Sequence, residues 1–286
     1  MWTKKAVITA AGASQRRLPL QTLVDRDGVS RTVLALLVRE VLSARIEQIC
    51  VVVSPGDEAL YAEAVPDYRD ALCFIPQHQP RGYGDALWRA RDFVGTDSFL
   101  HLVGDHVYLG RADGCAAELV RLAESEAACV SAVRATPERL LSSFGVVGGR
   151  AVAGRPGLYQ VDTVLEKPTP TVAEQRVIVP GLRSGHYLAF FGMHVLTPGV
   201  LDAIGRMLAE SPDRKVTLSD ALAVIAAQQK YLAYQVNAER YDLGARYGLL
   251  TSQLALALAS SDRDEVLSML VTMLANEQQY GQEAAR

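Results

Sequence analysis

Two carboxylates each follow a short strand-like run, and both could bind a metal ion. Asp105 ends the segment FLHLVGD, and Asp242 lies in YDLG. A carboxylate just past the end of a buried strand is a common magnesium ligand, because Mg²⁺ takes few protein oxygens and keeps several waters. A helix cap is the alternative interpretation of Asp105, since aspartate also accepts hydrogen bonds from the first turn of a helix.

Two further segments could bind a phosphorylated ligand. Residues 11–19, AGASQRRLP, combine Gly12 with Arg16, so the N–H groups of a tight turn would stand beside a forked cation. An exposed surface loop is the alternative. Glu166 and Lys167, in LEKP, offer an acceptor for sugar hydroxyls and a charge for a phosphate. A surface charge pair at a turn is the alternative there.

A glutamine stands five residues before a glycine in residues 77–86, QHQPRGYGDA. The amide of Gln77 offers a donor and an acceptor, which is what reading the edge of a nucleobase requires. Gly82 lets the backbone come close to a flat ring. The alternative is a loop that leads into a helix, and the spacing carries more information than either residue alone.

Strands and helices alternate in the part of the chain that would position these residues. Strands are predicted at Lys4–Ala11, Gln48–Val53, Leu72–Ile75, Phe99–Val103 and Cys129–Val133. Helices are predicted at Ser30–Ala44, Asp57–Val65 with Asp57 as its cap, Asp85–Phe93 and Cys115–Ser125. Such alternation predicts a parallel sheet with helices on both faces, and ligands that bind beyond the carboxyl ends of the strands.

The pattern changes after residue 134. Strands are predicted at Phe144–Val147, Tyr159–Leu165, Tyr187–Val195 and Tyr231–Val236. Helices begin at Thr197–Pro198, a cap followed by proline, and at Thr217–Asp220, which has capping-box spacing. Residues 245–286 are almost wholly helical in pattern, with an apolar stripe from Leu249 to Leu274. This tail either packs on the sheet or meets a second subunit, so a homo-oligomer is expected.

These elements predict an α/β chain with a Rossmann-like, mixed but mostly parallel central sheet, helices on both faces and a helical C-terminal tail. We expect one domain over residues 1–244, with halves at residues 1–134 and 135–244, and a helical segment over residues 245–286.

Composition and charge disfavour several classes of protein. Of the 286 residues, 49% are hydrophobic, which suits a packed core, and the net charge of −3 disfavours sequence-independent nucleic-acid binding. No apolar run approaches the roughly 20 residues of a membrane span, and no signal-peptide core follows Met1. The four cysteines lack zinc spacing and indicate buried, reduced thiols. We therefore expect a cytoplasmic protein without a nucleic-acid or membrane partner.

Taken in order, these segments resemble one family, the bacterial sugar-nucleotide pyrophosphorylases, and within it the UTP–glucose-1-phosphate uridylyltransferases. The resemblance extends from Lys5 to about Ala255. Its motifs match Ala11, Gly12, Arg16, Leu18 and Pro19; Gln77 and Gly82; Asp105 and Asp242; Gly145; Glu166, Lys167 and Pro168; and the helix start Leu218–Ala221. Each match alone is common, whereas all of them in this order are specific.

The resemblance implies a transfer between two small-molecule substrates, UTP and glucose 1-phosphate, that yields UDP-glucose and pyrophosphate with Mg²⁺ as cofactor. Positioning and charge neutralisation would supply the catalysis. The implied catalytic residues are Arg16, Asp105 and Lys167, and the implied metal ligands are Asp105 and Asp242. Residues 1–244 would be the catalytic domain. Its half over residues 1–134 would bind the nucleotide through Ala11, Gly12, Arg16, Gln77 and Gly82, and its half over residues 135–244 would bind the sugar through Gly145, Glu166 and Lys167.

The chain departs from the family in the loop that follows the first strand. The family carries a longer stretch with a lysine beyond the position of Pro19, whereas this chain has no lysine between Lys5 and Lys167. Arg17, Arg26 and Arg31 could substitute for it. Three interpretations remain open: an active uridylyltransferase, a weakened or inactive relative that binds a nucleotide or nucleotide sugar as a regulatory or partner subunit, or a thymidylyltransferase or enzyme for another sugar 1-phosphate.

Overall fold

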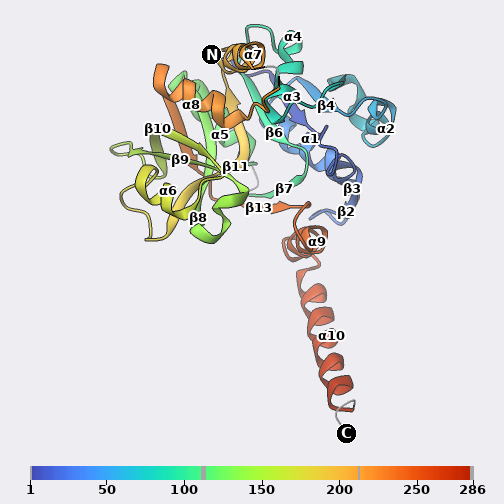
Figure 1. Ribbon diagram of the computed structural model, residues 1–286. Helices are drawn as coiled ribbons and strands as arrows, with labels where there is room; N and C mark the ends of the chain where they lie inside the picture. The colour runs from blue at the N-terminus through green and yellow to red at the C-terminus, as the bar shows by residue number, and fades with distance from the viewer. Residues whose placement is uncertain (1, 111–113, 212, 284–286) are drawn as a thin grey trace.

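A nine-stranded mixed sheet forms the centre of the molecule, shown as a computed structural model in Figure 1. The structure describes residues 2–110, 114–211 and 213–283, with side chains as far as residue 276. The strand order is β5-β4-β1-β6-β11-β8-β12-β10-β9. The strands are β1 (Lys5–Thr9), β4 (Gln48–Val53), β5 (Leu72–Pro76), β6 (Phe99–Val103), β8 (Cys129–Pro137), β9 (Gly145–Ala151), β10 (Leu158–Glu166), β11 (His186–Leu196) and β12 (Tyr231–Gln235).

Two short antiparallel pairs complete the strands. They are β2 (Thr22–Val24) with β3 (Ser30–Thr32), and β7 (His106–Leu109) with β13 (Glu239–Asp242). The sequence patterns did not predict these four strands, because each has only three or four residues. The β7–β13 pair matters most for the site, since it joins segments that are far apart in the sequence.

Parallel and antiparallel pairings divide the sheet. Strands β5, β4, β1 and β6 are parallel neighbours, and β12 is parallel to β8. The strand β11 runs antiparallel between β6 and β8, and β10 is antiparallel to both β12 and β9. The mixed α/β sheet is therefore confirmed. It is less parallel than the strand–helix alternation indicated, because the strands after β8 turn back between earlier ones.

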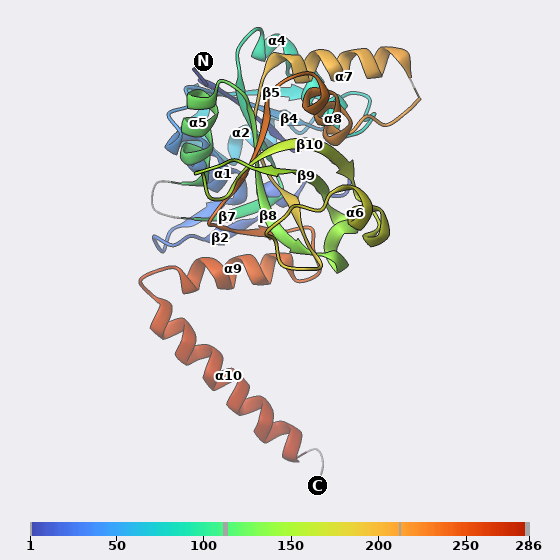
Figure 2. The ribbon, with the colours of Figure 1, turned by 90° about the vertical axis from the view of Figure 1, so that its left-hand side faces the viewer.

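Helices cover both faces of the sheet, as predicted. Their bounds are α1 (Val33–Ser43), α2 (Glu58–Glu63), α3 (Tyr83–Arg89), α4 (Arg91–Val94), α5 (Cys115–Glu126), α6 (Pro170–Arg176), α7 (Pro198–Glu210), α8 (Leu218–Gln228), α9 (Gly248–Leu258) and α10 (Arg263–Glu283). Short 3₁₀ turns lie at Leu18–Leu20, Pro66–Ala71 and Glu138–Ser143. Figure 2 shows α1 and α5 on one side of the sheet and α7 and α8 on the other.

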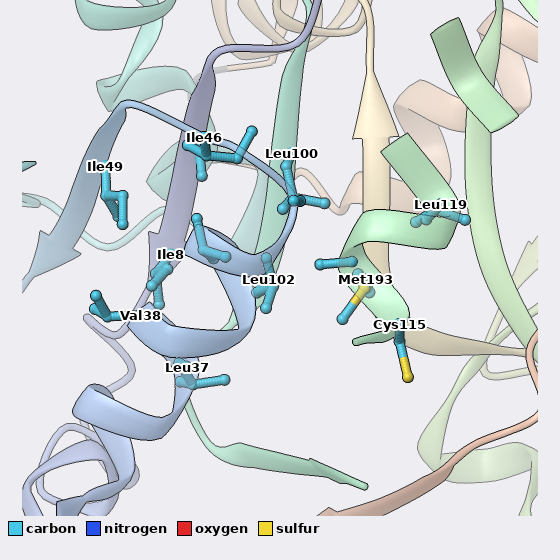
Figure 3. Close-up of a cluster of buried hydrophobic side chains, with 14 of the residues drawn as sticks. Ile8, Leu37, Val38, Ile46, Ile49, Leu100, Leu102, Cys115, Leu119 and Met193 are labelled. Carbon is cyan, nitrogen blue, oxygen red and sulfur yellow. The ribbon is translucent and has the colours of Figure 1, made fainter. Parts of the chain in front are cut away.

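Alternate residues of each strand enter opposite cores. Ile8 of β1 packs on one face with Leu37 of α1 and Leu119 of α5, as Figure 3 shows. Val7 faces the other way and packs with Leu87 of α3. Burying each large aliphatic side chain contributes about 1.5–3 kcal/mol, so these two cores hold the strand ends in fixed positions.

The predicted helix boundaries hold in some places and fail in others. The capping box of α8 is confirmed: Thr217 accepts from the N–H of Asp220, and Asp220 accepts from the N–H of Thr217. Asp57 is the N-cap residue of α2, as predicted, but its side chain makes no capping hydrogen bond. The helix predicted at Asp85–Phe93 is two helices, α3 and α4, which meet at Ala90.

The C-terminal helix α10 extends away from the rest of the molecule in both views (Figures 1 and 2). The preceding helix, α9, lies against β13 and β2. Residues 284–286 of the predicted helical tail lie outside the described residues. No described helix is both long and apolar enough to cross a membrane.

Candidate active site

A cavity of about 610 Å³ lies at the carboxyl ends of β1, β5 and β6. The second half of the chain closes it with the ends of β10 and β13 and the start of α8. Nine of the ten predicted site residues line this cavity: Ala11, Gly12, Gln77, Gly82, Asp105, Gly145, Glu166, Lys167 and Asp242. Segments separated by most of the chain therefore meet in one place.

Gln77 is held in a single orientation at the end of β5. Its Nε2 donates to Asp85 Oδ2 at 2.7 Å and to Gly82 O at 3.3 Å. Asp85 is fully buried and also pairs with Arg89 at 3.0 Å, so it is an acceptor. Because a carboxylate can only accept, the Gln77 nitrogen must face Asp85. Both amide donors are used, and the Gln77 carbonyl oxygen is left to accept from a ligand.

The loop that contains Gly82 is fixed against the strand-like segment before α8. Gly82 has a φ of +103°, which residues with a side chain rarely adopt, and a Cβ there would lie 2.8 Å from Val216 O. Gly84 N donates to Val216 O at 2.9 Å, and Val216 N donates to Arg81 O at 3.2 Å. The loop can therefore pack this closely on Val216 only because residue 82 is glycine.

The two predicted metal carboxylates lie together because β7 pairs with β13. Asp242 is in register with His106, and Leu243 N donates to Asp105 O at 2.9 Å. Strand β7 begins directly after Asp105, so Asp105 starts no helix and the helix-cap interpretation is wrong. Burial, and then the charge of Asp242, raises the pKa of Asp105 to about 6. A cation between the two carboxylates would relieve that repulsion.

The donor set at these carboxylates suits Mg²⁺. No group of three or more His, Cys, Asp or Glu side chains with metal-binding geometry occurs in the described part of the chain. Magnesium is commonly bound by one or two carboxylates together with waters and substrate phosphates. The adjacent His106 is neutral, since burial lowers its pKa to about 3. Asp105 and Asp242 therefore fit a magnesium ion that binds with its substrate.

The side of the cavity formed by β9 and β10 is closely packed around Gly145. A Cβ on Gly145 would lie 2.5 Å from Phe190 Cδ2 and 2.6 Å from Ser219 Oγ. Ser219 donates to Glu166 Oε2 at 2.5 Å, which fixes that carboxylate. Lys167 follows with a φ of +46°, an uncommon conformation for a residue with a side chain. Such backbone strain often accompanies functional residues.

Arg16 is the predicted site residue that does not line the cavity. Its Nη1 lies 3.4 Å from Oδ2 of the buried Asp57. The Arg16 carbonyl is held as well, because Tyr61 donates to it at 2.7 Å. The role predicted for Arg16 stays a prediction.

The three arginines considered as substitutes for the loop lysine also lie away from the cavity as described. Arg31 Nε donates to Asp25 Oδ2 at 2.7 Å. Arg26 lines a separate cavity of about 230 Å³, beside α1 and β7. Arg17 is exposed and does not line the site. None of these arginines takes the place of the missing lysine in this structure.

Several cavity residues were missed by the sequence patterns. Lys215 and Arg240 bring charge to the lining, and Thr9 and Tyr83 bring hydroxyl groups. The position of Arg240, two residues before Asp242 in a strand, is a signal for it, because such residues share one face. Lys215 stands two residues before the cap of α8 and carries no signal that sets it apart from a surface lysine.

Comparisons with known proteins agree with this geometry. Residues 5–257 match the family model described as Nucleotidyl transferase. UTP–glucose-1-phosphate uridylyltransferase 1 of Streptococcus pyogenes is 28% identical, over 95% of this chain and 94% of that protein. The Streptococcus pneumoniae UTP–glucose-1-phosphate uridylyltransferase is 27% identical, over 94% of this chain and 96% of that protein.

Solved structures share the fold. A UDP-glucose pyrophosphorylase complexed with UDP-glucose has a TM-score of 0.72 at 20% identity, over 88% of this chain and 98% of its own. The UTP-bound UGPase from Acinetobacter baumannii has a TM-score of 0.73 at 22% identity, over 94% of this chain and 99% of its own. With a family model matched over most of its length, the chain belongs to the nucleotidyl transferase family and is similar to its UTP–glucose-1-phosphate uridylyltransferases.

Proposed function

We propose that this nucleotidyltransferase makes UDP-glucose and pyrophosphate from UTP and glucose 1-phosphate, with Mg²⁺ as its cofactor. The observation that carries the proposal is that Asp105, Asp242, Gln77, Glu166 and Lys167 line one cavity. A base reader, a pair of metal carboxylates and a sugar-phosphate site would then meet in one place, as the reaction requires.

Residues 1–134 would hold the nucleotide. The free carbonyl oxygen of Gln77 is placed to accept the N3–H of uracil, and the Gly82 backbone lies close to the ring. Ala11 and Gly12 follow β1, where their N–H groups can bind phosphate oxygens. Arg16 would break its ion pair with Asp57 and bind the leaving pyrophosphate instead.

Residues 135–244 would hold the sugar phosphate. Glu166, fixed by Ser219, would accept hydroxyl hydrogen bonds from the hexose, which approaches the Gly145 backbone. Lys167 would neutralise the phosphate. When bound at Asp105 and Asp242, Mg²⁺ supplies positive charge that reduces the repulsion between the two anionic substrates. No side chain needs to act as a nucleophile, because the sugar phosphate itself attacks.

The test is to incubate the protein with UTP, glucose 1-phosphate and Mg²⁺, and to measure pyrophosphate. We expect release that depends on all three. Parallel titrations of UTP and UDP-glucose by calorimetry distinguish the alternatives. Binding without release would favour the nucleotide-binding relative, an alternative supported by the absence of any loop arginine from the described cavity lining. A protein with neither release nor binding would contradict both.

A thymidylyltransferase is the second candidate, and the same assay decides it. The acceptor that Gln77 leaves free serves thymine as well as uracil, since both carry the same N3–H. Replacing UTP by dTTP, and glucose 1-phosphate by other sugar 1-phosphates, therefore belongs in the first experiment. A higher kcat/KM for dTTP would change the substrate while leaving the roles of the carboxylates as proposed.

We also propose that the protein acts in the cytoplasm as a homo-oligomer. All four cysteines are free thiols, which suits a reducing compartment. Exposed apolar side chains on α10 support association: Leu267, Met269, Val271, Met273 and Leu274. They lie on a helix that extends beyond the domain, where a second copy could cover them.

A further inference from the structure

Positive charge in the described cavity lining comes from three residues, and all of them lie in the second half of the chain: Lys167, Lys215 and Arg240. The loop after β1, where such sites commonly bind phosphate, contributes small and uncharged residues to the lining. Apart from Arg16, which would reach the leaving pyrophosphate only after breaking its ion pair with Asp57, positive charge beside the reacting phosphates must therefore come from elsewhere. Lys167 is already placed on the sugar phosphate, which leaves the other two as candidates.

Arg240 is the more firmly built of the two. It lies on β13 two residues before Asp242, so both side chains are on the same face of that strand. Its Nη1 donates to Phe190 O at 2.6 Å. Its guanidinium carbon lies 4.2 Å from the centre of the Phe144 ring and 5.7 Å from that of Phe191. Lys215, in contrast, is exposed.

The guanidinium of Arg240 has more donors than the protein uses. It carries five N–H groups, and the hydrogen bond to Phe190 O occupies one of them. Among the described residues, no carboxylate forms an ion pair with Arg240. Burying a cation without a paired anion costs free energy, and a bound anion would offset that cost.

The position of Arg240 indicates which kind of ligand it serves. Arg240 shares a strand face with Asp242 and the cavity lining with Asp105, and its guanidinium lies over the ring of Phe144, next to Gly145. The anion that must occupy this place in a nucleotidyl transfer is a phosphoryl group. Arginine binds phosphate oxygens with two parallel hydrogen bonds, which a single lysine charge does not.

We propose that Arg240 is a catalytic residue that binds the phosphoryl oxygens at the junction of the two substrates, and supplies positive charge that the cavity-lining residues of the loop after β1 lack. This proposal rests on the proposed function. In the reaction, an oxygen of the sugar phosphate forms a bond to the α-phosphorus, and the bond from that phosphorus to the bridging oxygen breaks. Its electron pair leaves with pyrophosphate. Arg240 neutralises negative charge while the two phosphates approach, and no proton transfer is required.

The test compares R240Q with R240K. Glutamine keeps a polar side chain but carries no charge, whereas lysine keeps the charge and loses the fork. We expect kcat/KM of R240Q to fall about 100- to 1,000-fold, as for other donors to a reacting oxyanion, and R240K to recover part of it. A higher KM for glucose 1-phosphate alone places the contact on the sugar phosphate. A lower kcat at constant KM places it on the transferred phosphoryl group.

A second measurement does not depend on turnover. Calorimetry with UDP-glucose in EDTA reports binding without a metal, and R240Q should bind at least tenfold more weakly, as expected when one charged hydrogen bond is lost. R134Q is the matched control. Arg134 of β8 is paired with Glu239, which precedes Arg240 on β13, and Arg134 lies outside the described cavity lining. Its kinetics and binding should equal those of the wild type.

The outcomes separate this proposal from the proposed function. A folded R240Q protein with wild-type kcat/KM and wild-type affinity would overturn the role of Arg240 alone. If the wild type binds UDP-glucose without releasing pyrophosphate, weaker binding by R240Q supports the contact while the proposed activity fails. A wild type that neither binds nor turns over would overturn both. Circular dichroism and Tm show that each variant is folded.

Discussion

Asp105 is the residue at which function and stability oppose each other. Its carboxylate is largely buried beside Asp242, and its pKa is raised from 3.8 to about 6. At pH 7 the Asp105 carboxyl is ionised in the metal-free protein, and this buried charge lowers the free energy of unfolding. The unfolded chain has no such cost. The cost fades as the pH falls below 6, because the folded protein then holds the proton more tightly than the unfolded chain does.

Asp105→Asn should therefore abolish turnover and stabilise the metal-free protein. In EDTA at pH 7 we expect the variant's free energy of unfolding to exceed that of the wild type by on the order of 2 kcal/mol. This difference should shrink toward zero by pH 4. Urea unfolding at several pH values measures this, and pyrophosphate release measures activity. Asp242→Asn should lose activity too. Full activity in either variant would show that these carboxylates do not bind the metal.

At the scale of elements, the loop of Gly82 shows how two distant segments depend on each other. Gly82 and Gly84 hold this loop on Val216, directly before α8. A side chain at residue 82 meets both a strained φ and the Val216 carbonyl, so the loop must move away from the segment that supports it.

Gly82→Ala should raise KM for the nucleotide and lower stability by about 1–3 kcal/mol. Gly95→Ala is the matched control, because Gly95 also has a positive φ, +62°, but a Cβ there has no neighbour within 4 Å. The control should lose about 1 kcal/mol of stability and keep its KM. Initial-rate kinetics and thermal unfolding compare the two. Equal KM values in both variants would argue against a role for this loop in nucleotide binding.

The same scale explains what could be predicted from the sequence. β4 matches its predicted bounds, because a β-branched run ends at Ser54-Pro55-Gly56, and α8 follows from its capping box. β7 and β13 were not predicted, since short strands leave no periodic pattern and their pairing is long-range. Motif order predicted nine of the residues that line the cavity. Arg240 was missed, because its signal, a position two residues before Asp242 on one strand, depends on β13, which was not predicted.

For the molecule as a whole, the exposed apolar side chains of α10 are the feature that a second copy of the chain could cover. A chain that ends at Leu258 keeps every described residue that lines the cavity. We expect this truncated protein to be monomeric and folded, and the full chain to be dimeric or larger. Light scattering of both proteins tests it. Val271→Glu with Leu274→Glu in the full chain should give the same result as truncation, because both exposed side chains lie on α10. A monomeric full-length protein would contradict the proposed association.

The strand order also determines when the molecule can be completed during synthesis. β11 lies between β6 and β8, and β12 lies between β8 and β10, so late strands fill positions between early ones. A nascent chain that ends near residue 134 lacks β11 and β12. The edge of β6 that faces away from β1, and both edges of β8, are then unpaired. We therefore expect that residues 1–134 and 135–244 do not fold as separate units. Until β12 has left the ribosome, the exposed strand edges are sites for mispairing that a chaperone would have to protect.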